Sequence, residues 1–174
     1  MTSFIIDAHK GRPIPSSWKQ DPECPFCWII KGESPAFKVF ENDKVVAILD
    51  ILPLRRGHTL VIPKTHISRV SELPPEFAAA TGEAVSKVAN ALANALDNTA
   101  LNVVCNQEYA QAVPHVHYHI IPAPKFGSSV ESLKQERVTT PLSQKEMHKL
   151  EFQSREELDH DDATSLIKRI HARL

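Results

Sequence analysis

The chain has 174 residues, of which 42% are apolar and 24% charged, and its formal net charge at pH 7 is -1. This length is enough for one domain with a hydrophobic core, and the composition is that of a globular protein rather than a disordered chain. A near-neutral charge balance gives no general attraction to nucleic acid or to anionic lipid, so no nucleic-acid partner is expected and any phosphate binding must be local.

The N-terminal sequence lacks the basic start and long apolar run of a signal peptide, and no later run is long enough to span a bilayer. We therefore expect a cytoplasmic or nuclear protein that is not associated with a membrane. Its three cysteines are an odd number, and in a reducing compartment they are expected to be thiols or metal ligands rather than disulfides.

The first half of the chain predicts an arm followed by strands. Residues 1–21 are polar and interrupted by prolines, which predicts an irregular N-terminal arm whose order depends on docking. Short β-rich runs then alternate with turn signals and predict an antiparallel meander over residues 37–40, 45–51 and 58–62.

A long helix is predicted to open at Pro74-Pro75-Glu76, where proline suits the first turn, and to run to about Leu96. Its apolar face is expected to lie either in the core or in a dimer interface, and consists of Phe77, Thr81, Ala84, Val85, Val88, Leu92 and Leu96. Two further strands, over residues 100–105 and 113–121, complete an α+β fold. It has an antiparallel sheet of about five strands and one long helix.

The composition changes after the last predicted strand. Residues 127–153 are polar and predict a linker or tail, and Ser154-Arg-Glu-Glu157 fits a capping box that opens a final helix. Its apolar stripe is Leu158, Ala163, Leu166, Ile167, Ile170 and Leu174. This helix either packs on the body of the protein or binds a protein partner. The expected organisation is therefore an arm (1–21), a main domain (22–126) and a C-terminal extension (127–174).

The most informative segment is Pro114-His-Val-His-Tyr-His-Ile-Ile-Pro122. In an extended strand alternate side chains share a face, so His115, His117 and His119 project together while the apolar residues between them point to the opposite side. Imidazoles near neutral pH can supply a nucleophile, a proton donor and a cradle for phosphate. A row of three on one face is improbable as an incidental feature, and it predicts a functional site.

This run resembles the His-Φ-His-Φ-His-Φ-Φ signature of the histidine triad (HIT) family, in which Φ is apolar. The similarity covers roughly residues 22–124 and includes Cys24–Cys27, Ala47–Ile51 and Gly57–Ile67 in the family's order. The resemblance implies a homodimer of HIT-like fold that binds purine nucleotides. It also implies a two-step reaction without a catalytic cofactor, in which a histidine attacks the α-phosphate and water resolves the nucleotidyl-imidazole intermediate.

Carried over by position, the resemblance assigns roles to individual residues. It implies that His117 is the nucleophile and that His115 lies on the leaving-group side. His119 and His58 would contact phosphate or orient the nucleophile. Asp50 matches the acidic residue that holds the ribose hydroxyls, which is a strong charge-assisted arrangement. The remaining nucleotide-binding candidates are Ile48 and Ile51 for the base, and Asn106 and Gln111 for the phosphate or the nucleophile.

The loop between Asn106 and Gln111 departs from the family's pattern. It is one or two residues shorter than in well-known branches, and Ala110 stands where a glycine usually precedes the glutamine. Ala112 replaces the serine that the phosphoramidase branch uses near the leaving group. Since Gln111-Ala-Val113 partly resembles the dinucleoside polyphosphate hydrolases, the resemblance leaves open whether the substrate is a purine nucleoside phosphoramidate or a dinucleoside polyphosphate.

Cys24-x-x-Cys27 has the spacing of half a tetrahedral zinc site. Some members of the resembling family complete such a site with histidines that match His66 and His115, which implies a structural zinc tying the N-terminal segment to the sheet. A pair of buried thiols is the alternative, and Cys105 is expected in the core.

Two other functions remain open at this point. One is a zinc-dependent hydrolase that uses His115 and His117 as ligands of an open metal site. The other is a non-catalytic nucleotide-binding scaffold whose C-terminal helix recruits a protein partner.

Overall fold

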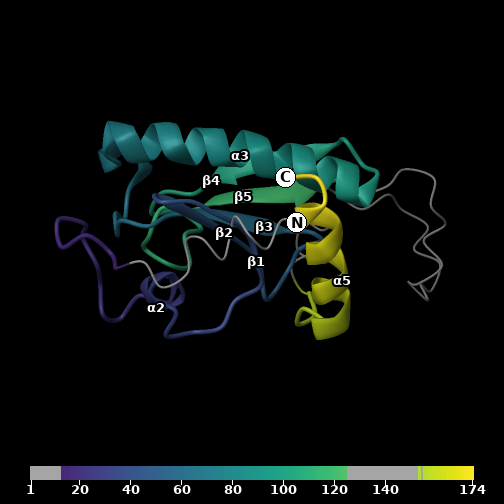
Figure 1. Cartoon of the computed structure of the whole chain (residues 1–174), viewed down its shortest axis with the longest axis horizontal. Coiled ribbons are helices and arrows are strands. Elements are labelled where there is room, and N and C mark those ends of the chain that lie inside the picture. The colour runs from purple at the N-terminus through teal and green to yellow at the C-terminus, as the bar shows by residue number, and fades with distance from the viewer. Residues whose placement is uncertain (1–12, 125–152, 154) are drawn as a thin grey trace.

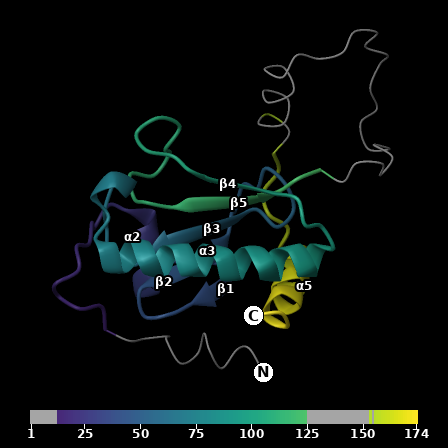
Figure 2. The same ribbon diagram turned by 90° about the horizontal axis from the view of Figure 1, so that it is seen from above.

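The computed structural model describes residues 13–124, 153 and 155–174. It contains a five-stranded antiparallel sheet in the order β1-β2-β3-β5-β4, with the long helix α3 lying along one face (Figures 1 and 2). The elements are α2 (Pro25–Lys31), β1 (Lys38–Glu41), β2 (Val45–Leu49), β3 (Thr59–Pro63), η1 (Val70–Glu72), α3 (Pro75–Leu96), β4 (Leu101–Cys105), β5 (Tyr118–Pro122) and α5 (His160–His171). This confirms the predicted α+β fold. No helix in the described ranges is long and apolar enough to cross a membrane.

Strands β2 and β3 form the centre of the sheet, and every residue in both is buried. Their side chains alternate between two cores: Ala47 and Leu49 face α3, whereas Val46 and Ile48 face α2. The strands pair in register from Val45 to Leu49, and the Asp50 N–H then donates to the His58 carbonyl oxygen over 2.9 Å. The loop from β2 to β3 therefore begins at Asp50 and ends at His58, side by side at one edge of the sheet.

Helix α3 covers the sheet with the face that the sequence predicts. It starts with proline in the first turn, as expected, and ends at Leu96 before Asp97, which takes a left-handed conformation with φ 52°. Phe77, Val88 and Leu92 are buried against the strands. The alternative between core and dimer interface is thus resolved for these residues in favour of the core.

Gly57 lets the β2–β3 loop pass close beneath the end of α3. Its φ is +89°, which glycine adopts without strain. A Cβ atom there would lie 2.7 Å from Cδ1 of Leu96 and 3.4 Å from Cγ of Pro122. Any other residue at this position would have to hold a strained left-handed backbone and displace the end of the Leu96 side chain.

The C-terminal helix packs on the body of the protein, one of the two outcomes expected. Ala163, Leu166 and Ile170 are fully buried in the core that α3 and the sheet share. The predicted start of this helix is wrong, because residues 155–159 are not helical and α5 begins at His160. The Asp159 side chain accepts the Asp162 N–H and caps the helix in place of the expected capping box. Ser154 and the predicted linker up to residue 152 lie outside the described residues.

Strand β5 is shorter than predicted: it begins at Tyr118 rather than near Val113. Tyr118 is the first residue that pairs with both neighbouring strands. Upstream of it, Pro114 has no N–H to give to a ladder, and the Val116 N–H donates instead to the Ile67 carbonyl oxygen. His115 therefore lies in a bend, where its N–H donates to the Val113 carbonyl oxygen over 2.8 Å, His117 lies just before the strand, and only His119 belongs to the strand.

The N-terminal segment contains one helix that the sequence analysis did not predict. Residues 13–24 have no helix or strand, as expected for an arm, and they dock through Trp18, whose ring packs edge-on against Phe77 at 4.9 Å. Helix α2 follows, with Pro25 in its first turn and Gly32 as a left-handed C-cap. This proline-to-glycine spacing is a recognised helix signal that could have revealed it. Residues 1–12 lie outside the described part.

Candidate functional site

The histidine segment keeps the alternation that the sequence predicts, although it leaves the sheet. Val116 packs with Phe77 on the α3 side, and Ile120 lies in the core beneath α3. The histidines face the α2 side: the rings of His117 and His119 are 4.8 Å apart, and Phe26 lies 5.1 Å from His117 and 5.9 Å from His115. One segment thus delivers three imidazoles to one surface.

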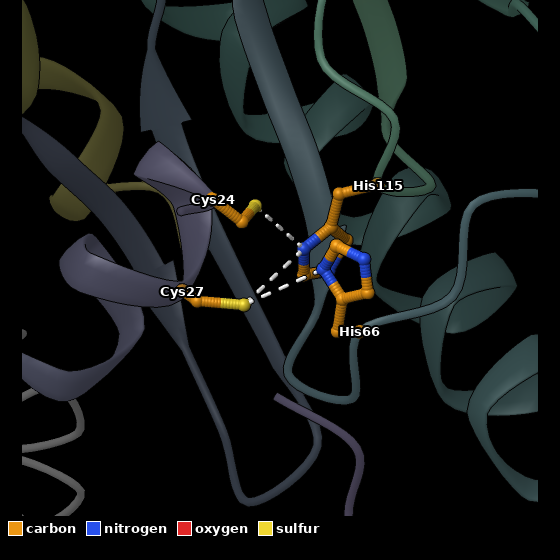
Figure 3. A group of neighbouring side chains, drawn as sticks. All are labelled: Cys24, Cys27, His66 and His115. Carbon is orange, nitrogen blue, oxygen red and sulfur yellow. Dashed lines mark hydrogen bonds between the residues drawn. The ribbon is translucent and has the colours of Figure 1, made fainter. Parts of the chain in front are cut away.

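His115 belongs to a sulfur cluster, which we define as Cys24, Cys27, His66 and His115 (Figure 3). Cys24 is the N-cap of α2 and Cys27 lies within this helix, and the histidines reach them from the loop after β3 and from the segment before β5. His115 Nδ1 lies 3.4 Å from Cys24 Sγ and 3.8 Å from Cys27 Sγ, and His66 Nδ1 lies 3.5 Å from Cys27 Sγ. The structure therefore brings together all four predicted metal ligands.

The sulfur cluster has the dimensions of a tetrahedral zinc site. Zinc bonds of about 2.3 Å to sulfur and about 2.0 Å to nitrogen hold the ligand atoms about 3.3–3.8 Å apart, and the distances above lie in that range. His115 gives its Nε2–H to the Pro63 carbonyl oxygen at 2.9 Å, which leaves the lone pair on Nδ1 facing the sulfurs. Asp21 lies 3.6 Å from His66 Nε2 and places a carboxylate behind that ring. These residues fit a structural zinc.

Protonation decides what this cluster can hold. Burial raises the pKa of the Cys27 thiol to about 11, so with no cation beside it the cysteine is neutral. Burial also lowers the pKa of His115 to about 4, which keeps this ring neutral and able to coordinate. A bound dication would stabilise the thiolates, because it supplies the positive charge that the apolar surroundings lack.

A second group, the histidine–carboxylate cluster, consists of Asp50, His58 and His119. The Leu54 N–H donates to His58 Nδ1 over 3.2 Å, so the proton of the neutral His58 ring is on Nε2, which lies 2.9 Å from His119 Nδ1. His119 then carries its own proton on Nε2. The Asp50 carboxylate lies 3.4 Å from His58 Nδ1, but an Nδ1 that accepts a hydrogen bond in a neutral ring makes no ion pair.

Burial sets the charges of this second cluster. It lowers the pKa of both His58 and His119 to about 4, and the positive charge of Arg155 acts in the same direction on His58. Burial raises the pKa of Asp50, although the hydrogen bond from the Leu52 N–H acts in the opposite direction. His58 and His119 form a hydrogen-bonded pair beside Asp50 rather than a cation cage, because Nε2 of His58 and Nδ1 of His119 already bond to each other.

His117 stands between the two clusters with a defined tautomer. Its Nδ1–H donates to the backbone carbonyl oxygen of His115 over 2.7 Å, so the lone pair of the neutral ring is on Nε2. Burial lowers the pKa of His117, whereas this hydrogen bond and Asp50 raise it. A neutral imidazole with its lone pair on Nε2 has the protonation state that nucleophilic attack requires.

The predicted apolar candidates flank these histidines to different degrees. Ile48 is buried in the same core cluster as Phe26, whereas Ile51 exposes 63% of its surface at the start of the β2–β3 loop. Phe26, which contacts His115 and His117, was missed by the sequence analysis. Its position between the two cysteines was the available signal, since a metal-binding turn beside the histidines must place its middle residues against them.

The loop from Asn106 to Gln111 uses its amides internally. The Gln111 side chain donates to the Ser68 carbonyl oxygen and accepts the Glu108 N–H, and the Asn106 amide donates to the Ala110 carbonyl oxygen. The Gln111 amide carries a second N–H besides the one given to Ser68, and the contact with phosphate expected of Gln111 stays a prediction. Glu108 and Ala110 have left-handed backbones, with φ 62° and 55°.

In the described residues, the potential metal-ligand groups do not combine His115 with His117. His115 turns Nδ1 toward the cysteines and gives Nε2–H to Pro63, so both ring nitrogens are engaged. This arrangement favours the metal-ligand role predicted for His115 over the role on the leaving group.

Comparison with known proteins finds relatives of similar sequence. The chain is 42% identical over 102 residues to Adenylylsulfatase HINT3 of Arabidopsis thaliana; the match covers 58% of this chain but only 52% of that protein. It is 43% identical over 110 residues to Adenosine 5'-monophosphoramidase hnt1 of Schizosaccharomyces pombe, covering 62% of this chain and 80% of that protein.

A solved structure shares the fold. It is a Zn-bound histidine triad family protein from Mycobacterium smegmatis, with a TM-score of 0.64 and 29% sequence identity, covering 86% of this chain and 94% of that one. The family model described as the HIT domain matches residues 31–126. The chain therefore belongs to the HIT domain family.

Proposed function

We propose that the chain is a nucleotide hydrolase that cleaves at the α-phosphorus of a purine nucleotide through a covalent bond to His117. The single observation that carries this proposal is the hydrogen bond from His117 Nδ1 to the His115 carbonyl oxygen, since it leaves the Nε2 lone pair for attack. The two relatives are named as an adenylylsulfatase and an adenosine 5'-monophosphoramidase, and both names support a proposal of nucleotide hydrolysis by this chain.

In the first step, His117 Nε2 forms a bond to the α-phosphorus and the bond from phosphorus to the leaving group breaks. The leaving group takes up a proton as it departs. In the second step, the oxygen of a water molecule bonds to phosphorus and the bond to Nε2 breaks, releasing the nucleoside monophosphate. The proton that the water loses balances the proton that the leaving group gained, and His117 returns to its starting tautomer.

The other residues of the site have supporting roles in this proposal. The His58–His119 hydrogen bond leaves the His119 Nε2–H as a donor to phosphate oxygens. Asp50 holds the ribose hydroxyls, and Ile48, Ile51 and Phe26 supply an apolar surface for the base. Asn106 and Gln111 contact phosphate through the second hydrogen of each side-chain amide.

We also propose that Cys24, Cys27, His66 and His115 hold a structural zinc. A closed site with four protein ligands would fix α2 to the segment that carries His117 and leave no ligand position for substrate. The zinc-bound relative from Mycobacterium smegmatis supports the presence of the metal. Zinc content measured on the purified protein by plasma mass spectrometry tests this part.

Labelling of the protein tests the covalent step. We expect the chain, mixed with α-labelled adenosine phosphoramidate and quenched rapidly, to carry an acid-labile label. We expect no label on His117→Ala and full label on the matched control His160→Ala, because His160 is exposed and lies at the start of α5. A label that survives in His117→Ala would overturn the assignment.

A homodimer is expected from the resemblance, and we retain it as part of the proposal. Edge strand β4 pairs only with β5 in the described sheet and exposes 45% of Val103. Light scattering during size-exclusion chromatography would measure the mass directly, and a mass of one chain at micromolar concentration would contradict the dimer.

A further inference from the structure

The C-terminal extension is fastened to the loop that joins β2 to β3 at two points. The Leu158 N–H donates to the Ile51 carbonyl oxygen over 2.9 Å, near the start of the loop. Near the end of the loop, the Arg56 guanidinium donates to both carboxylate oxygens of Asp162, in the first turn of α5, at 2.6–2.9 Å. Because α5 is anchored in the core, both contacts tie the loop to a fixed part of the molecule.

Arg56 stands in the turn that sets the ring of His58. The His58 N–H closes this turn on the Arg55 carbonyl oxygen over 2.9 Å, and the Leu54 N–H donates to His58 Nδ1 over 3.2 Å. The second bond lies at the upper end of the range for a hydrogen bond, so a small opening of the turn would break it. The anchoring of Arg56 therefore bears directly on whether the Leu54 N–H stays within reach of the ring.

Two tautomers of His58 compete at this point. With the Leu54 N–H on Nδ1, the ring carries its proton on Nε2 and donates to His119, which leaves the His119 Nε2–H for phosphate. The competing partner is the Asp50 carboxylate, whose Oδ2 lies 3.4 Å from His58 Nδ1. If the proton moved to Nδ1 and bonded to Asp50, His58 Nε2 would accept a proton from His119 Nδ1–H. His119 would then present a lone pair to phosphate instead of a donor.

We propose that Asp162 is a positioning residue for the phosphate site: through its bonds to Arg56 it holds the turn that keeps the His58 proton on Nε2. This inference rests on the proposed function, in which the His119 Nε2–H donates to phosphate oxygens. It makes α5 part of the reaction site, although the family model ends at residue 126. The planar guanidinium suits this task, because paired hydrogen bonds to a carboxylate fix the direction of the side chain as well as its distance.

Imidazole nitrogen spectroscopy tests this role together with kinetics. In the full chain labelled with heavy nitrogen, we expect the chemical shifts of His58 to show a bare Nδ1 and a protonated Nε2. In Asp162→Asn we expect a mixture of tautomers, since a carboxamide offers Arg56 only one acceptor oxygen. We expect kcat for adenosine phosphoramidate to fall roughly three- to tenfold and KM to stay within about twofold, because the His119 donor acts on charge that grows in the transition state.

Matched variants separate this role from a general effect on the helix. Asp161→Asn removes an exposed carboxylate from the same turn of α5, and it should keep the single tautomer and the full kcat. Asp162→Glu keeps both acceptor oxygens and should recover most of the kcat. Arg56→Gln combined with Asp162→Asn should lose no more than Asp162→Asn alone, because both changes break the same contact. The ion pair is partly exposed, so the unfolding midpoint should hardly move in these variants.

A single His58 tautomer in Asp162→Asn, an unchanged kcat, or equal results for the two asparagine variants would each overturn the inference. If the unaltered chain did not hydrolyse phosphoramidate, the proposed function would be overturned instead. The nitrogen shifts would still report separately on the link from Asp162 to His58.

Discussion

The sulfur cluster and His117 use histidines only two residues apart, yet the backbone prepares the two rings in opposite ways. His115 gives Nε2–H to the Pro63 carbonyl oxygen and turns Nδ1 toward the cysteines. His117 gives Nδ1–H to the His115 carbonyl oxygen and keeps the lone pair of its neutral ring on Nε2. The same residue type therefore becomes suited to a metal or to phosphorus according to which nitrogen a carbonyl takes.

The largest effect should come from replacing the ring proposed as nucleophile. We expect His117→Asn to lower kcat/KM by about 10⁴-fold, or about 5 kcal/mol, because the covalent route is lost while much of the site's volume is kept. AMP affinity should change little, since Asp50 and the apolar surface remain. If the variant kept a kcat/KM within tenfold of that of the unaltered chain, His117 would not be the nucleophile and would have no reactive role that sets it apart from His115.

Replacing a residue of the sulfur cluster should lower the stability of the protein rather than remove a reactive group. We expect Cys27→Ser to lose most of its zinc and to lower the free energy of unfolding by about 3 kcal/mol, because one ligand of a closed site is gone. Urea unfolding and metal analysis measure the two quantities. Cys105→Ser, in β4 and outside the cluster, is the matched control. Equal zinc content in both variants would show that Cys27 is not a ligand.

The histidine–carboxylate cluster should make stability depend on pH. Burial lowers the pKa of His58 from 6.5 to about 4, so the folded chain favours the neutral ring. Above pH 6.5 the ring is neutral in both the folded and the unfolded chain and the folded chain keeps its full stability. As the pH falls from 6.5 toward 4, the unfolded chain takes up the proton more readily, and the free energy of unfolding drops by about 2 kcal/mol at pH 5. The unfolding free energy of His58→Asn should therefore fall less steeply between pH 6.5 and 5 than that of the unaltered chain. If the two curves of unfolding free energy against pH were parallel, His58 would not be held neutral by burial.

The smallest effect concerns the loop beside the histidine segment. Ala110 has φ 55°, a conformation that costs an alanine roughly 1–2 kcal/mol and a glycine almost nothing. After the added entropy of a glycine in the unfolded chain, we expect Ala110→Gly to raise the unfolding free energy by about 0.5 kcal/mol. Ala112→Gly lacks this benefit, because its φ is not positive, and should lower stability instead. If both variants had a lower unfolding free energy than the unaltered chain, the backbone of Ala110 would not be strained.

Sequence reasoning predicted the strands and α3 because their signals are local. Hydrophobic alternation and proline at the first turn do not depend on distant contacts, and β2, β3 and α3 lie close to their predicted positions. It misplaced the starts of β5 and α5, where the outcome depends on partners far along the chain. Val116 bonds to Ile67, and Leu158 bonds to Ile51. No periodicity within either segment contains that information.

The candidate site divides in the same way. The sulfur cluster could be named from spacing together with the family resemblance, and the structure brings its four members together. The conflict between the two roles expected of His115 could not be seen in the sequence. It arises because Pro63, 52 residues away, takes the Nε2 proton. The placement of the C-terminal segment beside the β2–β3 loop was likewise hidden, since only the docking of α5 brings the two together.

Gly57 carries a consequence for mutational surveys of this protein. Any other residue there, directly before His58, would need the strained φ of +89° and would have to move the end of the Leu96 side chain. In a screen that scores activity alone, substitutions at Gly57 would be grouped with those of the reactive histidines, although glycine offers no functional group to a nucleotide. Protein abundance measured in the same screen would separate the two groups, because the steric defect should also deplete the folded population.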